Sequence, residues 1–369
     1  MPGDKKMRDV FEQSGYLGAM SEKDTPATRP GERITIREVA QDAGVSVAAV
    51  SKVLRDAYGV SDALRTKVRA SMAKLNYRPR ASARGMRGRT YTIGLIFPDL
   101  RNPFFADIYS GVNAALERTQ YQAMQGINTT SGAVNTTSSA LIEAMIDRQM
   151  DGLIVIGPNI DMQALINLGE RVPLVVVGHH DRGGDAFDTV NNDDQLGARL
   201  VVRHLVAKGF RRPAMLSLTP ATSSIIQQRE VGYRLEMMEL GCGEAINIVR
   251  ASQVVRDVQV AVRRLLSDAN RPDAIFCWTD LMAFEAISVA TEMGLSIPED
   301  LAIVGYDNTI FCDLAQNSLT SVDQSGELLG LQAARMLIER IDGRTSAEHF
   351  IVPPRIVARG SASATSEAE

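Results

Sequence analysis

The sequence contains few cysteines, a single tryptophan and no long apolar run. Cys242, Cys277 and Cys312 are too few and too scattered for a disulfide framework or a zinc site, so we expect no metal and no cofactor. No apolar segment approaches the roughly 18 residues of a membrane helix. The first 33 residues lack the apolar stretch of a secretory signal. These absences predict a cytoplasmic protein with reduced thiols and no membrane contact.

Short signatures of common enzyme classes are also missing. The sequence contains no G-x-S-x-G, G-x-x-x-x-G-K-[ST], G-x-G-x-x-G or H-E-x-x-H pattern. We therefore predict a protein that is not an enzyme and has no catalytic residues. A cytoplasmic enzyme is the alternative, which turnover of a ligand would support.

Positive charge is in deficit overall but concentrated near the N-terminus. The whole chain has 40 Lys and Arg against 44 Asp and Glu, a net charge of −4. Between Arg33 and Arg89, however, 13 basic residues stand against 4 acidic ones, which leaves 27 and 40 for the remainder. A basic segment on an acidic body predicts a polyanionic partner for that segment alone, and a merely solvated charged surface is the alternative.

The basic segment contains a pair of short helical patterns in "REVAQDAGVSVAAVSKVL", residues 37–54. A small residue, a turn glycine and an apolar residue follow in the order Ala40, Gly44 and Val50, as a helix-turn-helix requires. Short side chains and two cations share the outward face of the second helix, which suits the major groove: Ala48, Ser51, Lys52 and Arg55. A plain helical bundle is the alternative, but it leaves the positive charge unexplained.

From Thr92 onward, apolar strands alternate with helical stretches. The strands include "TIGLIF", "GLIVIG", "PLVVVG", "PAMLSL", "DAIFC" and "LAIVGY". Continuous apolar strands that alternate with helices predict parallel sheets covered on both faces. About 270 residues of this pattern are too many for one doubly wound unit, so we expect two α/β lobes. Ligands in such folds bind beyond the carboxyl ends of the strands, here between the lobes.

These segments together resemble the LacI/GalR family of bacterial repressors. The resemblance runs from about Ile34 to Gly360 and includes "ITIREVAQDAGVSVAAVSKVL", "TIGLIFPDLRNPFF", "REVGY", "TDLMAFEAI", "PEDLAIVGYDN", "LTSVDQ" and "VPPRIVARGS". It implies an all-α helix-turn-helix head, a hinge helix, and a core of two doubly wound parallel-sheet lobes like the type I periplasmic binding proteins. The core should dimerise.

The resemblance also divides the chain. We expect a disordered extension (1–32), the helix-turn-helix domain (33–78), a hinge (79–90), the two-lobed core (91–360) and a flexible tail (361–369). The first lobe should comprise about 91–190 and 324–351, and the second about 192–321 and 354–360. The chain should cross between the lobes near 190–192, 321–324 and 351–354.

Carried over position by position, the family implies a set of DNA contacts. Thr35 should meet a phosphate, and Ser61 and Tyr77 should add contacts to the DNA backbone. The recognition helix should contribute Ser46, Val47, Ala48, Ser51, Lys52 and Arg55. Val47 and Ala48 can read only thymine methyl groups or DNA shape, so polar readout should fall on Lys52 and Arg55. In the hinge, Met86 takes the place of the usual minor-groove leucine, with Arg80 and Arg84 beside it.

The family likewise implies an effector site between the lobes, formed by Asn102, Phe104, Phe105, Arg229, Trp278, Asp280, Asp307 and Gln324. The arginine and the carboxylates suit hydroxyl groups, and the aromatic rings suit the C–H faces of a sugar. Several of these residues have plainer alternatives: Asp280 as a helix cap, Phe104 as a core residue and Trp278 as core or rim packing. His179 and His180 are expected to be solvated, as adjacent histidines in a loop usually are, with contact to the ligand as the alternative.

We therefore predict a homodimeric transcriptional regulator, with a tetramer left open. It should repress carbohydrate-use genes, bind a near-palindromic operator with minor-groove contact at its centre, and respond to a sugar or sugar derivative. A regulator of the same architecture with a nucleoside or another effector is one alternative. A cytoplasmic sugar-modifying enzyme is another, and a secreted sugar-binding protein, which export would support, is a third.

Overall fold

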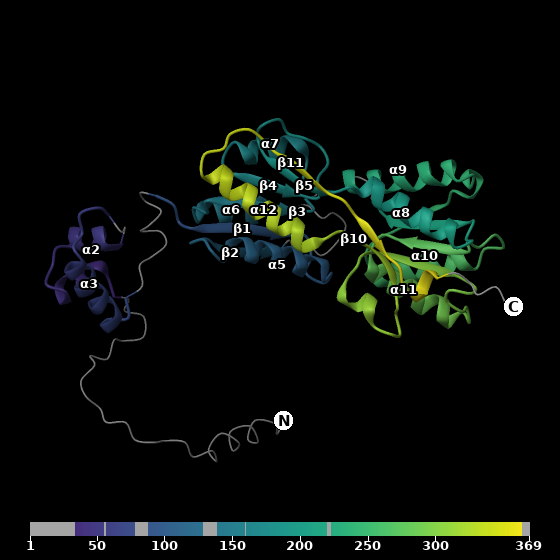
Figure 1. Cartoon of the computed structure of the whole chain (residues 1–369), viewed down its shortest axis with the longest axis horizontal. Coiled ribbons are helices and arrows are strands. Elements are labelled where there is room, and N and C mark those ends of the chain that lie inside the picture. The colour runs from purple at the N-terminus through teal and green to yellow at the C-terminus, as the bar shows by residue number, and fades with distance from the viewer. Residues whose placement is uncertain are drawn as a thin grey trace, which may run out of the picture. The chain divides into compact units, whose positions relative to one another are not determined.

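The computed structural model describes residues 34–54, 57–77, 88–127, 139–158, 160–219 and 223–363. It divides into two compact units, residues 1–80 and 81–369 (Figure 1). The predicted extension (1–32), the recognition residue Arg55, and the hinge residues Arg80, Arg84 and Met86 lie outside the described residues. No described helix has the length and apolar character to cross a membrane.

The N-terminal unit is the predicted helix-turn-helix. Its helices are α1 (Ile36–Asp42), α2 (Val47–Leu54) and α3 (Asp62–Lys74). Between the first two, Gly44 has a φ of 58°, a conformation that glycine adopts without strain. The buried side chains are small and apolar: Val39, Ala40, Ala43, Val50, Val53 and Val68. They come from all three helices, so the apolar spacing read from the sequence identifies this core.

The first lobe of the core is a six-stranded sheet with the strand order β11-β5-β4-β3-β1-β2. Its strands are β1 (Thr92–Phe97), β2 (Gln122–Ile127), β3 (Gly152–Ile156), β4 (Leu174–Val177), β5 (Asp188–Asn192) and β11 (His349–Val352). Its helices are α5 (Phe104–Leu116), α6 (Ser139–Asp147), α7 (Met162–Gly169) and α12 (Gly326–Ile341). The strand pairs are parallel, as predicted.

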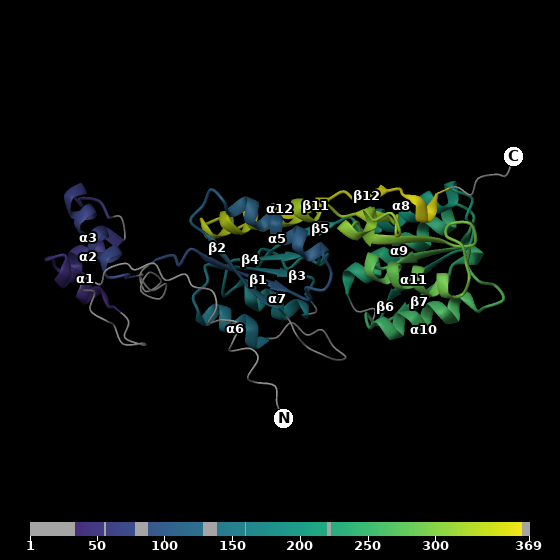
Figure 2. The same ribbon diagram turned by 90° about the horizontal axis from the view of Figure 1, so that it is seen from below.

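Alternate residues of these strands face two separate apolar layers. Ile93 and Leu95 pack with α5 and α12, whereas Ile96 packs with α6 and α7 on the opposite face. Figure 2 shows the two helix pairs on opposite sides of the sheet. At the crossing of α5 and α12, a Cβ placed on Gly330 would lie 1.9 Å from the carbonyl oxygen of Ile108. The two helix backbones therefore touch, which only glycine permits there.

The second lobe is also six-stranded, with the order β12-β10-β9-β8-β6-β7. Its strands are β6 (Pro213–Leu218), β7 (Ile248–Ala251), β8 (Ala274–Cys277), β9 (Ala302–Asp307), β10 (Thr320–Asp323) and β12 (Arg355–Val357). Its helices are α8 (Asp194–Ala207), α9 (Ser224–Glu239), α10 (Val255–Leu266) and α11 (Asp280–Glu292), with short 3₁₀ turns at Gly243–Ala245, Ile310–Asp313 and Gly360–Ala362. The pair α8 and α9 covers one face and the pair α10 and α11 the other (Figures 1 and 2).

Two features of this lobe correct the predicted picture. The last strand, β12, pairs antiparallel with β10, so the sheet is not wholly parallel. The expected flexible tail also begins too early, because Ser361 and Ala362 are buried. The Ser361 hydroxyl donates a hydrogen bond to the carbonyl oxygen of Ile303 at 2.6 Å. The lobe therefore extends at least to Ala362.

One buried side chain ties together the three places where the chain passes between the sheets. These passages lie between β5 and α8, between β10 and α12, and between β11 and β12. The Asn192 amide donates to the carbonyl oxygens of Gln324 (3.5 Å) and Val352 (3.1 Å), one from each of the other two passages. Its amide oxygen accepts from the hydroxyl of Tyr306 at 3.1 Å. Asn192 therefore connects the three passages to one another and to Tyr306.

Candidate functional site

The outward face of α2 presents the side chains predicted to read DNA. Val47 is 42% exposed, and Ala48 and Lys52 are also exposed. Ser51 is half-buried, between this face and the core side. Ser46 lies at the start of the helix, where its hydroxyl accepts from the backbone N–H of Ala49 at 3.1 Å. The helix thus shows solvent a surface of small side chains with one cation.

The residues predicted to contact the DNA backbone lie at helix ends. The backbone N–H and hydroxyl of Thr35 both donate to the Glu38 carboxylate, at 2.6 and 2.8 Å, which lowers the pKa of Glu38. Ser61 caps α3 by accepting from the N–H of Leu64 at 3.3 Å. Tyr77 packs partly buried against the helical core. Thr35 and Ser61 are exposed and lie at helix N-termini, where the helix dipole favours anions.

In the two-lobed core, Arg229 is the centre of a group of polar side chains. It is only 4% exposed. Its Nε donates to the Asp194 carboxylate at 2.7 Å, its Nη1 to the carbonyl oxygen of Trp278 at 3.0 Å, and its Nη2 to Oε1 of Gln324 at 3.4 Å. The rings of Trp278 and Tyr306 lie 4.1 and 3.5 Å from the guanidinium carbon. Both rings and the carboxylate therefore hold this cation in place.

The Asp194 carboxylate joins the two lobes. Its second oxygen lies 2.7 Å from Nε2 of His180, which follows β4 of the first lobe. The backbone N–H of His180 donates to the hydroxyl of Ser224 on α9 at 3.1 Å. His180 is therefore a contact between lobes, and its neighbour His179 is buried, so the expectation of two solvated histidines is wrong.

Asp307 makes the second contact between lobes. Its carboxylate accepts from the amide of Asn102, in the first lobe, at 2.7 Å and from the amide of Gln324 at 2.6 Å. Burial raises the pKa of Asp307 to about 8, reinforced by the nearby Asp280 and opposed by Arg229. Its backbone φ of 116° is rarely adopted by residues other than glycine, and such strain concentrates at functional sites.

We call this group the interlobe cluster and define it as Asn102, His180, Asp194, Arg229, Trp278, Tyr306, Asp307 and Gln324. Five of these residues were predicted from the sequence: Asn102, Arg229, Trp278, Asp307 and Gln324. The other three, Asp194, His180 and Tyr306, were not assigned to the site. Asp194 stands in "NNDDQ", where it reads as a helix-capping residue, although Asp193 supplies the cap.

The remaining predicted effector residues lie apart from the cluster or face away from it. Asp280 is fully buried, and its carboxylate accepts from the hydroxyl of Ser321, the N–H of Thr309 and the thiol of Cys312. Burial raises its pKa, opposed by these hydrogen bonds. Its protein donors occupy both oxygens, and it is Thr279 that caps α11. Asp280 therefore supports the loop that follows Asp307.

The two phenylalanines of "RNPFF" belong mainly to the first lobe. Phe104 is buried in its core, which matches the plainer alternative for this residue, and Phe105 packs partly buried against it with ring centroids 5.8 Å apart. The backbone N–H of Phe104 donates to Oδ1 of Asn102 at 3.1 Å. This bond fixes the asparagine amide so that its NH₂ group faces Asp307.

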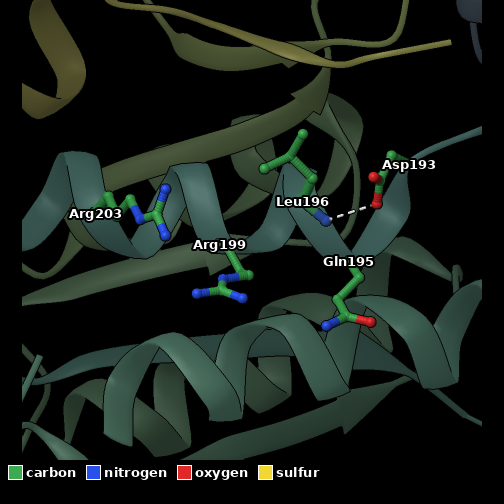
Figure 3. A pocket seen from close by; sticks show the side chains of 5 residues that line it. All are labelled: Asp193, Gln195, Leu196, Arg199 and Arg203. Atoms are coloured by element: carbon green, nitrogen blue, oxygen red, sulfur yellow. Dashed lines mark hydrogen bonds between the residues drawn. The ribbon is translucent and has the colours of Figure 1, made fainter. Parts of the chain in front are cut away.

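The structure also has an open groove, about 360 Å³ in volume, along α8. Figure 3 shows the side chains that line it: Asp193, Gln195, Leu196, Arg199 and Arg203. None belongs to the interlobe cluster. Arg199 and Arg203 both pair with Glu236 on α9. In the described part of the chain, no group of three or more His, Cys, Asp or Glu could hold a metal ion.

Comparisons with known proteins agree with this architecture. Residues 35–80 match the model of the bacterial regulatory proteins of the lacI family, and residues 202–362 match a periplasmic binding protein-like domain. The ribose operon repressor of Haemophilus influenzae is 31% identical over 89% of this chain and 98% of its own length. The transcriptional repressor PurR of Erwinia tasmaniensis is 32% identical over 89% and 96%.

A solved structure extends the likeness to the fold. A crystal structure of the lac repressor dimer bound to operator and the anti-inducer ONPF matches with a TM-score of 0.78 at 24% identity, over 90% of this chain and all of that chain. At this identity the match supports the fold alone, whereas the curated relatives carry the assignment. The chain therefore belongs to the lacI family of bacterial regulatory proteins and is a DNA-binding transcriptional regulator.

Proposed function

We propose that this regulator represses genes of carbohydrate use from the cytoplasm, and that it binds a near-palindromic operator as a homodimer. The head supports this by its exposed α2 face and its concentrated positive charge. A relative 31% identical is named a ribose operon repressor, which supports carbohydrate genes as targets. Two heads held by one core dimer would match two half-sites at a fixed separation, so the operator should be symmetric.

The observation that carries the effector part of the proposal is the interlobe cluster. Hydrogen-bonding groups from both lobes meet there, beside the three passages of the chain. Hydroxyl groups of a sugar can exchange with the bonds that Asn102, Asp307 and Gln324 now make to one another. Three of the five N–H groups of Arg229 donate within the protein, which leaves two for a ligand oxygen. Binding without turnover is sufficient for regulation.

The experiment is a pair of titrations. Sugars, polyols and nucleosides are first screened by thermal shift, and the responding compound is titrated into the full chain with and without operator DNA. Because coupling is reciprocal, operator should change the affinity for the effector by the factor by which effector changes the affinity for operator. Equal effector affinities in the two titrations would contradict control by the effector, and chemical change of the ligand would indicate an enzyme.

Arg229→Ala gives the test of the site. This variant should bind operator as the wild type does and lose its response to the effector, because the ligand's hydroxyl groups would lose their buried donors. The control is Arg263→Ala, which removes an exposed arginine that pairs with Glu292 on the surface of the same lobe. An Arg229→Ala protein that keeps the wild-type effector affinity would remove this residue from the site.

A further inference from the structure

We propose that Asp194 determines the charge of the effector: it neutralises Arg229 and thereby excludes anionic ligands, such as phosphorylated sugars, in favour of uncharged ones. The proposal deepens the function proposed above, since it rests on the interlobe cluster as the effector site. It begins with the position of Asp194, which the sequence alone did not assign to the site. The residue is 2% exposed, and both oxygens of its carboxylate are engaged.

The charge of Arg229 is already matched within the protein. Arginines bind phosphate most strongly through two parallel hydrogen bonds from one edge of the guanidinium group. The Nε of Arg229 instead lies 2.7 Å from Asp194, and this ion pair is buried on both sides. The rings of Trp278 and Tyr306 both pack against the guanidinium group. Arg229 can offer its remaining N–H groups to a neutral oxygen, but its charge is already balanced.

The charges of Arg229, Asp194 and Asp307 sum to 0 or to −1. Arg229 and Asp194 cancel, so the total is 0 when Asp307 is protonated and −1 when it is ionised. Burial raises the pKa of Asp307 to about 8, which favours the protonated form. Nε2 of His180 lies 2.7 Å from the same Asp194 carboxylate. These three residues therefore offer a phosphate dianion no excess positive charge, and burying an unmatched anion is costly.

Three other arginines of the core near the strand ends are already held in ion pairs: Arg101 with Asp99, Arg355 with Asp323 and Arg359 with Asp313. The undescribed stretches within residues 91–360, namely 128–138, 159 and 220–222, contain no Lys, Arg, His, Asp or Glu in the sequence. They therefore add no charge to this part of the chain. Removing the Asp194 charge is the single substitution that would leave Arg229 without its counter-ion.

The test compares Asp194→Asn with Asp193→Asn in the full chain. Both variants lose one negative charge, but Asp193 caps α8, whereas it is Asp194 that forms the ion pair with Arg229. The probe is inorganic phosphate at constant ionic strength, and the readout is the fluorescence of Trp278, the only tryptophan, which lies against Arg229. Phosphate bound to the basic head, or a general salt effect on stability, is common to both variants and does not act on this signal.

We expect a saturable fluorescence change in Asp194→Asn, with an affinity for phosphate at least about tenfold above that of Asp193→Asn and the wild type. Asp194→Glu should restore the wild-type behaviour, because it restores the charge. Equal phosphate affinities in Asp194→Asn and Asp193→Asn would overturn the proposal. If the asparagine variant does not fold, Asp194→Ser repeats the test. Saturable phosphate binding in the wild type, detected by Trp278 fluorescence, would by itself overturn the proposal.

The proposal for Asp194 and the proposed function can fail independently of each other. Operator binding and the response to neutral sugars are measured on the same proteins. If the wild type responds to no sugar but Asp194→Asn gains phosphate binding, the sugar effector is rejected and the role of Asp194 is retained. If the wild type responds to a sugar but Asp194→Asn gains no phosphate binding, the role of Asp194 is rejected and the sugar effector is retained.

Discussion

Asp307→Asn should change how the stability of the core depends on pH. The wild-type carboxyl accepts two amide hydrogen bonds, from Asn102 and from Gln324. An asparagine has one oxygen, so one of these amides will face an NH₂ group instead. Neither amide group can flip freely to present its oxygen instead, because Oδ1 of Asn102 accepts from the N–H of Phe104 and Oε1 of Gln324 accepts from Arg229. At low pH the variant should therefore be less stable, by about 1 kcal/mol or more.

The difference in stability between the wild type and Asp307→Asn changes sign as the pH rises. Burial raises the pKa of Asp307 from its usual 3.8 to about 8. Between these values the unfolded chain releases the proton while the folded chain keeps it, so the unfolded state binds fewer protons and the wild type loses stability with increasing pH. For one group the slope approaches about 1.4 kcal/mol per pH unit, and it levels off above the folded pKa. The variant lacks this loss and should become the more stable protein near neutral pH.

Urea unfolding followed by Trp278 fluorescence measures this difference, because Trp278 is buried in the second lobe. The free energies of unfolding of wild type and variant are compared at half-unit steps from pH 5.5 to pH 8. Asp313→Asn, which removes an exposed carboxylate from the same lobe, controls for the change in net charge. Curves for wild type and Asp307→Asn that stay parallel over this range would show that Asp307 is ionised throughout, and would refute the reasoning.

Two further predictions concern the head and the first lobe. Lys52→Ala should weaken operator binding by about tenfold to a hundredfold if Lys52 reads a base edge, as fluorescence anisotropy against operator and random DNA will show; equal losses on both would assign Lys52 to a phosphate. Gly330→Ala should lower the free energy of unfolding by about 1–3 kcal/mol despite the better helix propensity of alanine, because its Cβ would meet the Ile108 carbonyl. A melting temperature at or above that of the wild type would contradict this close packing.

The apolar strands were predicted from the sequence, and the polar ones were not. "TIGLIF" and "LAIVGY" identify β1 and β9 because both faces of these strands are buried. β5 is equally buried, yet it reads "DTVNN". Its Asp188 is neutralised by Arg340 and Arg344, which lie about 150 residues later. Hydropathy cannot identify a strand whose burial depends on partners so distant in sequence, and the contacts that explain β5 exist only in the folded chain.

The interlobe cluster could likewise be predicted only in part, because some of its contacts join residues that are distant in sequence. Arg229 and Asp307 could be assigned because "REVGY" and "GYDN" match motifs of the family. Asp194 could not, because its role depends on two partners, one from each lobe, and its local sequence reads as a helix start. Asp280 shows the opposite case. The family resemblance implied a ligand contact for it, but donors from Ser321, Thr309 and Cys312 turn the carboxylate into the protein.

The first residues of the core determine how an effector could act on the DNA-binding segment. Arg89 donates to Asp342, and the backbone N–H of Thr90 donates to Asp151, so the chain enters the core anchored to the first lobe alone. Asn192 ties the three passages between the lobes at one point. We expect an effector that binds both lobes to act through its different affinities for two arrangements of them. Its effect would then reach the DNA-binding segment through the first lobe, where Thr90 is held.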